Sequence, residues 1–228
     1  MEFRTVLVRI GAYLLVPVLF LVLWGVIDRQ LNNEVILPGV GQVAALFLQP
    51  TESLIAMGSL ATNVAISLVR VLAGYLLAVC LAIPLGILMG YYGTVYRLLN
   101  GFLALFRPIP PLAWVPLVLA WFGVASLASM FGVEEGKAYL YLNNLKLSMI
   151  FIIFIGAFYP VLTSAIHGVM GVRSTLLDSA RVLGAGEWDI FRKILLPAAA
   201  PSIVNGMRIG LGVAWMCLVS AEMLPGSI

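Results

Sequence analysis

Long apolar runs that contain almost no charged residue dominate the chain. About 20 residues of helix cross a hydrocarbon core about 30 Å thick, so runs of this length predict membrane-spanning helices. Five runs qualify: residues 10–27, 71–96, 108–133, 147–172 and 198–221. The pattern predicts an all-α integral membrane protein, a single transmembrane domain over residues 1–228 that is a bundle of about five transmembrane helices. A cleaved signal peptide is a second interpretation of the first run, which is long for that class and has no clear small-x-small cleavage motif before Asp28.

The composition supports this pattern. Of the 228 residues, 62% are hydrophobic and 10% are charged, against about 45–50% and about 25% in soluble domains. These proportions exclude a soluble globular protein and a disordered chain. The 13 basic residues are scattered and the net charge is only +3, so nucleic acid is not an expected partner. Both cysteines lie in apolar runs, where neither a disulfide framework nor a metal site is indicated.

The distribution of lysine and arginine predicts the orientation, because short cytoplasmic loops carry an excess of them. An N-terminus on the cytoplasmic side leaves only Arg29, Lys137 and Lys146 outside. It places seven basic residues inside: Arg4, Arg9, Arg97, Arg173, Arg181, Arg192 and Lys193. We therefore expect a cytoplasmic N-terminus. Five spans place the C-terminus outside, and because an even count is more usual, a sixth span is expected to be missing.

Residues 173–197 form a polar segment between the fourth and fifth runs. Ser174 is a candidate N-cap of a first short helix, whose apolar face is formed by Leu176, Ala180 and Leu183. Glycines at 184 and 186 interrupt it before a second short helix. Two interpretations are open: helices lying on the lipid interface, or a protrusion that docks into a soluble partner.

Small residues and prolines mark the spans. Two Gly-xxx-Gly pairs predict close helix contacts, which we interpret as packing within the chain rather than between subunits: Gly86 with Gly90, and Gly206 with Gly210. Three prolines are each expected to remove a hydrogen bond inside a span: Pro84, Pro116 and Pro160.

The polar segment contains a recognisable spacing. Asp178-Ser179-Ala180, three residues and Gly184 are followed after nine residues by Ile194-x-Leu196-Pro197. This arrangement resembles the Glu-Ala-Ala signature loop of binding-protein-dependent ABC transporter permeases, with Asp178 in place of the glutamate. In that family the loop forms coupling helices that sit in a cleft of the cytoplasmic ATPase. The resemblance implies these ATPase-coupling residues: Asp178, Ala180, Gly184, Ala185, Glu187, Ile194, Leu196 and Pro197.

A second resemblance narrows the family. The run from Arg107 through Pro116 to Trp121-Phe122-Gly123, with Arg70-Val71-Leu72-Ala73-Gly74 and the segment from Arg208 to Met223, looks like the nitrate, sulfonate, taurine and bicarbonate import permeases. Two features depart from that pattern. Residues 124–146 form a longer external excursion, and family members continue after Glu222-Met223 into a further span.

The resemblance implies the type I ABC importer permease fold in a bacterial inner membrane, and alternating access as the mechanism. It implies three kinds of protein partner: cytoplasmic ABC ATPase subunits, a second permease copy, and a periplasmic or extracellular substrate-binding protein. Membrane lipid surrounds the chain. The cargo implied is a small anion of the nitrate, sulfonate or bicarbonate class.

Catalytic chemistry is not evident in the residues. The nearest approach to a P-loop, Gly132-x-x-x-Gly136-Lys137, has three intervening residues instead of four and lacks the following Ser or Thr. The single histidine, His167, has no acidic residue or cysteine within a helical turn, so we expect no metal site. We predict that the chain is not an enzyme and holds no cofactor, and that ATP and Mg²⁺ bind the partner ATPase.

A few charges fall within the spans, where they face a cavity or a partner or extend to the headgroups. Arg70 and Arg107 lie near span ends, so extension to the headgroups is open for both, whereas Arg208 lies about ten residues into the last run. The basic excess favours an anion pathway. We take these residues as candidates for the pathway: Arg107, Trp114, Arg208 and Glu222.

Three other classes remain as alternatives. A secondary transporter or channel without an ATPase would show inverted repeats or midplane carboxylates, and neither is found. A membrane enzyme lacks catalytic groups. A truncated subunit that does not transport is the third.

Overall fold

The computed structural model describes residues 2–31, 33, 36–51, 53–54, 58–123, 125–130, 132, 135–136, 139 and 142–222. These residues are almost entirely helical, which confirms the all-α class. The chain divides into two compact units, Met1–Val64 and Ala65–Ile228. That they act as one permease domain stays a prediction.

The first unit contains two helices and a short strand pair. Helix α1 spans Glu2–Leu31 and α2 spans Val40–Leu48, and strand β1 (Ser53–Leu54) pairs antiparallel with β2 (Gly58–Ser59). The Trp24 indole Nε1 donates a hydrogen bond to the Pro38 carbonyl oxygen at 3.1 Å. From Tyr13 onward none of the apolar side chains of α1 is buried, and most are exposed, as expected of a helix whose solvent is lipid.

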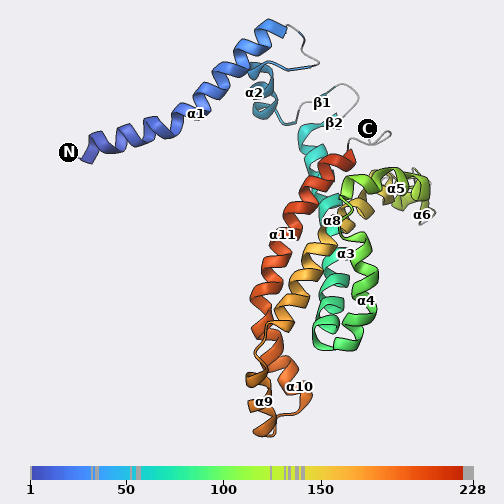
Figure 1. Ribbon diagram of the computed structural model, residues 1–228. Helices are drawn as coiled ribbons and strands as arrows, with labels where there is room; N and C mark the ends of the chain where they lie inside the picture. The colour runs from blue at the N-terminus through green and yellow to red at the C-terminus, as the bar shows by residue number, and fades with distance from the viewer. Residues whose placement is uncertain are drawn as a thin grey trace. The chain divides into compact units, whose positions relative to one another are not determined.

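The second unit is built around long helices (Figure 1). Its helical elements are α3 (Leu60–Tyr91, which begins in the first unit), α4 (Gly93–Phe106), η1 (Pro111–Trp114), α5 (Val115–Phe122), α6 (Leu127–Met130), α8 (Leu147–Met170), α9 (Ser174–Val182), α10 (Glu187–Ile190), the π-helical η2 (Phe191–Leu195) and α11 (Leu196–Glu222). Figure 1 shows α8 between α3 and α11.

Helix α8 is the centre of this unit, and glycines let its neighbours approach it. A Cβ placed on Gly86 of α3 would lie 2.5 Å from the Cβ of Ala165, and one on Gly90 would lie 2.6 Å from that of Val169. On α11, Cβ atoms at Gly206 and Gly210 would likewise overlap two α8 side chains, those of Ser164 and Val161. Both Gly-xxx-Gly pairs therefore pack within the chain, as we interpreted them.

Among the described residues, four helices are long and apolar enough to span a membrane, and α4 with η1–α5 makes a fifth if this bent pair counts as one span. The count of about five is confirmed in this form. The limits of the second and third spans were wrong, because α3 ends at Tyr91 and α4 then returns along the bundle. The bend between α4 and η1–α5 is 81°. Its cause is a cluster of prolines at 108, 110 and 111, which lack the N–H that a helix needs.

The three span prolines differ in their positions. Pro84 lies inside α3 and Pro160 inside α8. Pro116 lies in the first turn of α5, where the missing N–H would have no helical partner in any case. The predicted loss of a span hydrogen bond at Pro116 is therefore wrong.

Residues 223–228, which follow the last predicted run and bear on the sixth span, lie outside the described residues.

The excursion at 124–146 lies partly outside the described residues. The two ends of this excursion meet, because Ser126 and Lys146 form an antiparallel bridge and the Leu147 N–H donates to the Ala125 carbonyl oxygen at 3.1 Å. Its role stays a prediction.

Candidate functional site

The segment predicted to couple to an ATPase folds as α9, α10 and η2 at one end of the second unit (Figure 1). One detail of the prediction was wrong. Ser174 is the first helical residue, and the N-cap position is Arg173, whose side chain makes no capping bond. On the predicted apolar face only Ala180 is buried, whereas Leu176 and Leu183 are 49% and 86% exposed, because α9 packs on its neighbours over too few residues to cover the whole face.

The small residues of the motif form the turn that ends α9. Gly184 has φ +80°, a left-handed conformation, and its N–H donates to the Arg181 carbonyl oxygen at 2.9 Å. The Ala185 N–H donates to the Ala180 carbonyl oxygen at 3.0 Å. These two bonds form a Schellman motif, which satisfies the last carbonyls of a helix and needs glycine at its left-handed position. The small residues at 180, 184 and 185 thus define a sharp turn between the two short helices.

We expect Gly184→Ala to weaken this turn by about 1 kcal/mol, because a Cβ is disfavoured in the left-handed region. Gly186→Ala is the matched control, since Gly186 has φ −69° and both positions have open space for a Cβ. Hydrogen exchange of the amides at 184 and 185 measures the effect. Equal exchange rates in the two variants would contradict the assignment.

Arg181 joins the two short helices. Its Nη1 lies 3.1 Å from Asp178 Oδ1 and its Nε lies 2.9 Å from Glu187 Oε1. The hydrogen bond and charge of Glu187, followed by those of Asp178, raise the pKa of the Arg181 guanidinium above its usual value. The guanidinium therefore stays charged, and the acidic residues at 178 and 187 serve to orient it.

Glu187 also reaches the end of α3. The Tyr91 hydroxyl donates to Glu187 Oε2 at 2.7 Å, and the ring of Tyr91 meets that of Phe191 edge to face at 6.3 Å. The chain then passes through the π-helical turn η2 directly into α11. Of the remaining predicted coupling residues, Ile194 lies in η2, and Leu196 and Pro197 are the first two residues of α11.

Large apolar side chains are exposed around this turn. Val182, Leu183 and Trp188 are 87%, 86% and 70% exposed. We call α9, α10 and these three side chains the coupling knob. Such exposure at a loop that also carries charges is typical of a protein contact surface. The sequence pattern did not single out Val182 or Tyr91; the i, i+3 spacing of Asp178 and Arg181 was a usable signal for their ion pair.

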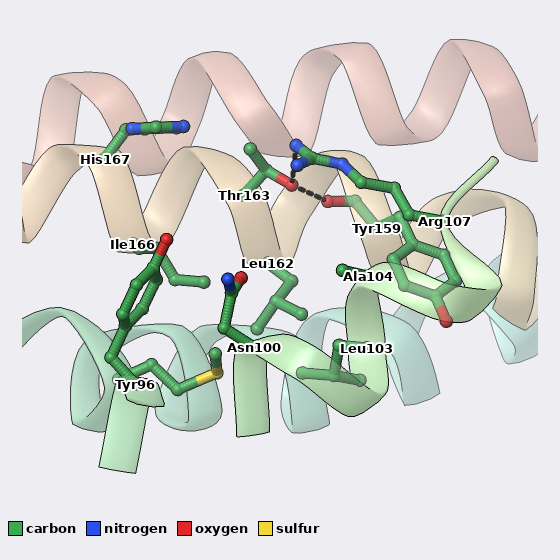
Figure 2. A pocket seen from close by; sticks show the side chains of 11 residues that line it. Tyr96, Asn100, Leu103, Ala104, Arg107, Tyr159, Leu162, Thr163, Ile166 and His167 are labelled. Atoms are coloured by element: carbon green, nitrogen blue, oxygen red, sulfur yellow. Dashed lines mark hydrogen bonds between the residues drawn. The ribbon is translucent and has the colours of Figure 1, made fainter. Parts of the chain in front are cut away.

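Among the pathway candidates, Arg107 follows α4 and extends toward α8 (Figure 2). Its Nη2 donates to Thr163 Oγ1 at 2.9 Å. Arg208 is exposed on α11, and no partner is found for it within the described part of the chain. Trp114 is 8% exposed in the core, where its Nε1 has no hydrogen-bond partner among described residues. The structure therefore does not gather the four candidates in one place.

Glu222 belongs instead to a partly buried cluster with Arg70. Arg70 is 6% exposed, and its Nη1 lies 3.1 Å from Glu222 Oε1 while its Nε donates to the Asn144 carbonyl oxygen at 2.9 Å. The Ser67 hydroxyl donates to the same carboxylate oxygen. Extension of Arg70 to the headgroups is therefore wrong, because a partner from α11 holds it. Burial, together with the Arg70 charge, lowers the pKa of the nearby Lys146.

The chain is similar to a known family and to several known proteins. Residues 82–227 match the family described as binding-protein-dependent transport system inner membrane component. A putative ABC transporter permease of Methanocaldococcus jannaschii is 48% identical over 92% of this chain and 72% of its own length. The taurine transport system permease of Escherichia coli is 35% identical over 98% and 74%. A nitrate import permease of Leptolyngbya laminosa is 36% identical over 73% and 52%.

The family match covers more than half of the chain, from within α3 through the coupling knob and α11. The two relatives that are 48% and 35% identical cover 92% and 98% of this chain. The chain therefore belongs to the family of binding-protein-dependent transport system inner membrane components, the membrane-spanning permeases of ABC transporters.

Proposed function

We propose that the chain is the permease subunit of an ATP-driven importer that carries a small anion across the inner membrane by alternating access. ATP and Mg²⁺ would bind a separate cytoplasmic ATPase, and this chain would supply the pathway and the contact that couples the two. A second permease copy would complete the pathway. A substrate-binding protein would deliver the anion to the outer face.

The coupling knob is the observation that carries this proposal. Its tip exposes apolar side chains to a partner, and its base is continuous with α11 through η2. The Tyr91–Glu187 hydrogen bond ties the same element to α3. A partner that moves the knob would therefore move the ends of two spanning helices together, which is what coupling to ATP hydrolysis requires.

The charge distribution supports a cytoplasmic location for the knob and for the N-terminus. Arg97 lies in the first turns of α4, soon after Tyr91, so it is at the same end of the second unit as the knob. Four further basic residues belong to the knob segment: Arg173, Arg181, Arg192 and Lys193. An excess of arginine and lysine at one end marks the cytoplasmic side.

The residues also favour an anionic cargo. Within the described part of the chain, Arg107 and Arg208 have no carboxylate partner, whereas Glu222 is paired with Arg70. The unbalanced charges in the spans are thus positive. Two relatives are named for taurine and nitrate, both of which carry an anionic oxygen group.

Association with an ATPase tests the proposal. We expect the chain to co-purify with a candidate ABC ATPase from the same genome, and Leu183→Asp to reduce the recovered ATPase at least about tenfold, because a charge replaces an apolar contact at the tip. Ser174→Asp is the control: it adds the same charge to the first turn of α9, where an acidic residue is tolerated.

Anion uptake by vesicles supplies the second measurement. Uptake that requires the ATPase and ATP supports the importer. Uptake that continues without the ATPase would overturn the proposal in favour of a secondary transporter or channel. A complex that assembles and hydrolyses ATP but moves no anion would assign the chain a non-transporting role.

A further inference from the structure

An apolar groove lies between the end of α3 and the segment formed by α10 and η2 (Figure 1). It is half open to its surroundings and has a volume of about 620 Å³. The last two turns of α3, from Pro84 to Tyr91, form one wall, and Trp188 and Phe191 belong to the other. Leu196, the first residue of α11, also lines it. The groove therefore lies between elements that the proposed coupling moves.

The groove runs from the end of a spanning helix toward the interior of the membrane. Helix α3 is long and apolar enough to span, and Pro84 lies seven residues before its Tyr91 end, about 10 Å along the axis. The apolar lining is uncovered: Leu88 is 47% exposed and Trp188 is 70% exposed. At this depth the solvent of an open apolar groove is lipid.

Aromatic side chains gather at the end of the groove that lies beside the end of α3. The rings of Trp188 and Phe191 stack at 5.6 Å, and those of Tyr91 and Tyr92 meet edge to face at 4.9 Å. Tryptophan and tyrosine are enriched where the hydrocarbon core meets the headgroups, because each has an apolar body and a polar tip. This end of the groove thus suits the junction between an acyl chain and its headgroup.

The charges at this end favour an anionic headgroup. Glu187, the acidic residue that lines the groove, already accepts hydrogen bonds from Arg181 and from the Tyr91 hydroxyl. Arg192 follows Phe191 directly and is exposed, and it has no carboxylate partner among the described residues. The charge left unpaired beside the groove is therefore positive, and a guanidinium binds phosphate oxygens through paired hydrogen bonds.

We infer that this groove binds an acyl chain of one anionic phospholipid of the inner leaflet, with the chain against Leu88 and Trp188 and the phosphate on Arg192. The inference rests on the proposed function in one respect, because the coupling knob must face the cytoplasm for the groove to open to that leaflet. It goes beyond that function by giving the permease a lipid partner at the joint between α3 and the coupling segment.

Quenching of Trp188 fluorescence by brominated acyl chains tests the groove, because bromine quenches an indole only at short range. The full chain is placed in phosphatidylcholine nanodiscs that contain increasing fractions of brominated phosphatidylglycerol or brominated phosphatidylcholine. The Trp188 signal is the difference between each protein and its Trp188→Phe version. We expect half-maximal quenching at an about fivefold lower fraction of phosphatidylglycerol than of phosphatidylcholine, because the headgroup charge adds to binding.

Two arginine variants test the headgroup contact. Arg192→Gln should abolish the difference between the two lipids, because it removes the charge beside the groove. Arg173→Gln is the matched control: Arg173 is an exposed arginine at the start of α9, outside the groove, so the fivefold difference should persist. Loss of the difference in both variants would mean a diffuse attraction of anionic lipid to the basic end and would overturn the site.

Two leucine variants test the acyl-chain contact on α3. Leu88→Gln should weaken quenching by both lipids several-fold, because an amide replaces an apolar side chain in the groove. Leu81→Gln places the same amide on the same helix outside the groove, at a leucine that is 56% exposed, and it should leave Trp188 quenching unchanged. Equal effects of the two variants would contradict an acyl chain at this position.

Three results with the wild-type chain would overturn the inference. Equal quenching by the two lipids would show ordinary surrounding lipid without a site. An absence of quenching by either lipid would show that another part of the protein or a second copy covers the groove. Quenching by phosphatidylglycerol that disappears when the ATPase is added would assign the groove to the ATPase.

The same preparations are tested for association with the ATPase, which separates failure of this inference from failure of the proposed function. A chain that binds the ATPase but shows no preference for phosphatidylglycerol overturns the lipid site and leaves the permease proposal standing. A chain that shows the preference, and loses it in Arg192→Gln, supports the lipid site even if no ATPase associates with it.

Discussion

Replacing Arg70 by methionine is expected to lower the free energy of unfolding by about 1.5–3 kcal/mol, because the substitution removes the charged hydrogen bond to the Glu222 carboxylate, whose side chain is 34% exposed, and the bond to the Asn144 carbonyl oxygen. Arg70 is almost fully buried, and it contacts Glu222 and the Asn144 carbonyl at once. Its loss therefore removes a bond between α3 and α11 and a second bond to the segment before α8. Unfolding in mixed micelles of increasing denaturing detergent measures the change.

Two further variants separate the ion pair from general effects of the substitution. Arg97→Met removes an exposed arginine of α4 that forms no ion pair within the described residues, so its effect should be within about 0.5 kcal/mol. Adding Glu222→Gln to Arg70→Met should recover part of the loss, because the partly buried carboxylate charge that Arg70 neutralised is then removed as well. If Arg70→Met and Arg97→Met unfold alike, the ion pair does not stabilise the bundle.

Gly206→Ala is expected to destabilise the bundle by about 3 kcal/mol, the upper end of the range for overpacking a core. The added Cβ would overlap the Cβ of Ser164, which is fixed to the α8 backbone and cannot rotate away, and it would lie 3.3 Å from the Pro160 carbonyl oxygen. Helices α8 and α11 would have to separate. The same detergent titration measures the loss.

Gly212→Ala provides the control on the same helix. A Cβ on Gly212 has open space, with no atom within 4 Å, so this substitution should be neutral or stabilise α11 by up to about 1 kcal/mol through helix propensity. Equal effects at 206 and 212 would mean that helix propensity, and not close packing against α8, determines the outcome.

Two contacts, Arg70 with Glu222 and Tyr91 with Glu187, should make α3 and α11 move together. Arg70 and Glu222 connect α3 and α11 at one end of the bundle, and Tyr91 and Glu187 connect α3 to the segment that leads into α11 at the other. On α3 these two contacts lie at Arg70 and Tyr91, 21 residues apart, which separates them by about 32 Å. We expect a displacement of the coupling knob to move the two helices as a pair.

In the coupling loop, the sequence predicted the position of the turn but not the contacts that its side chains make. The spacing of Asp178, Ala180 and Gly184 located the loop, and the structure shows that its small residues form a Schellman turn. The spacing placed Leu183 on an apolar face and left open what covers it, and the structure shows this side chain exposed, since periodicity indicates which residues share a face and not what packs against them. The contact from Tyr91 joins residues 96 positions apart, and no local pattern indicates such a pair.

The sequence by itself determined the approximate number of spans, the helical class, the position of the coupling loop and the glycine pairs, because each follows from a local pattern: the length of an apolar run, its period, or a short motif. Only the tertiary structure decided which charges are paired and which are free. It joined Arg70 to Glu222 and placed Arg107 against Thr163 without a carboxylate partner among the described residues. The physical reason is that a charge in a membrane is stabilised by whatever lies within hydrogen-bond distance, and that distance is set by how α3, α4, α8 and α11 pack.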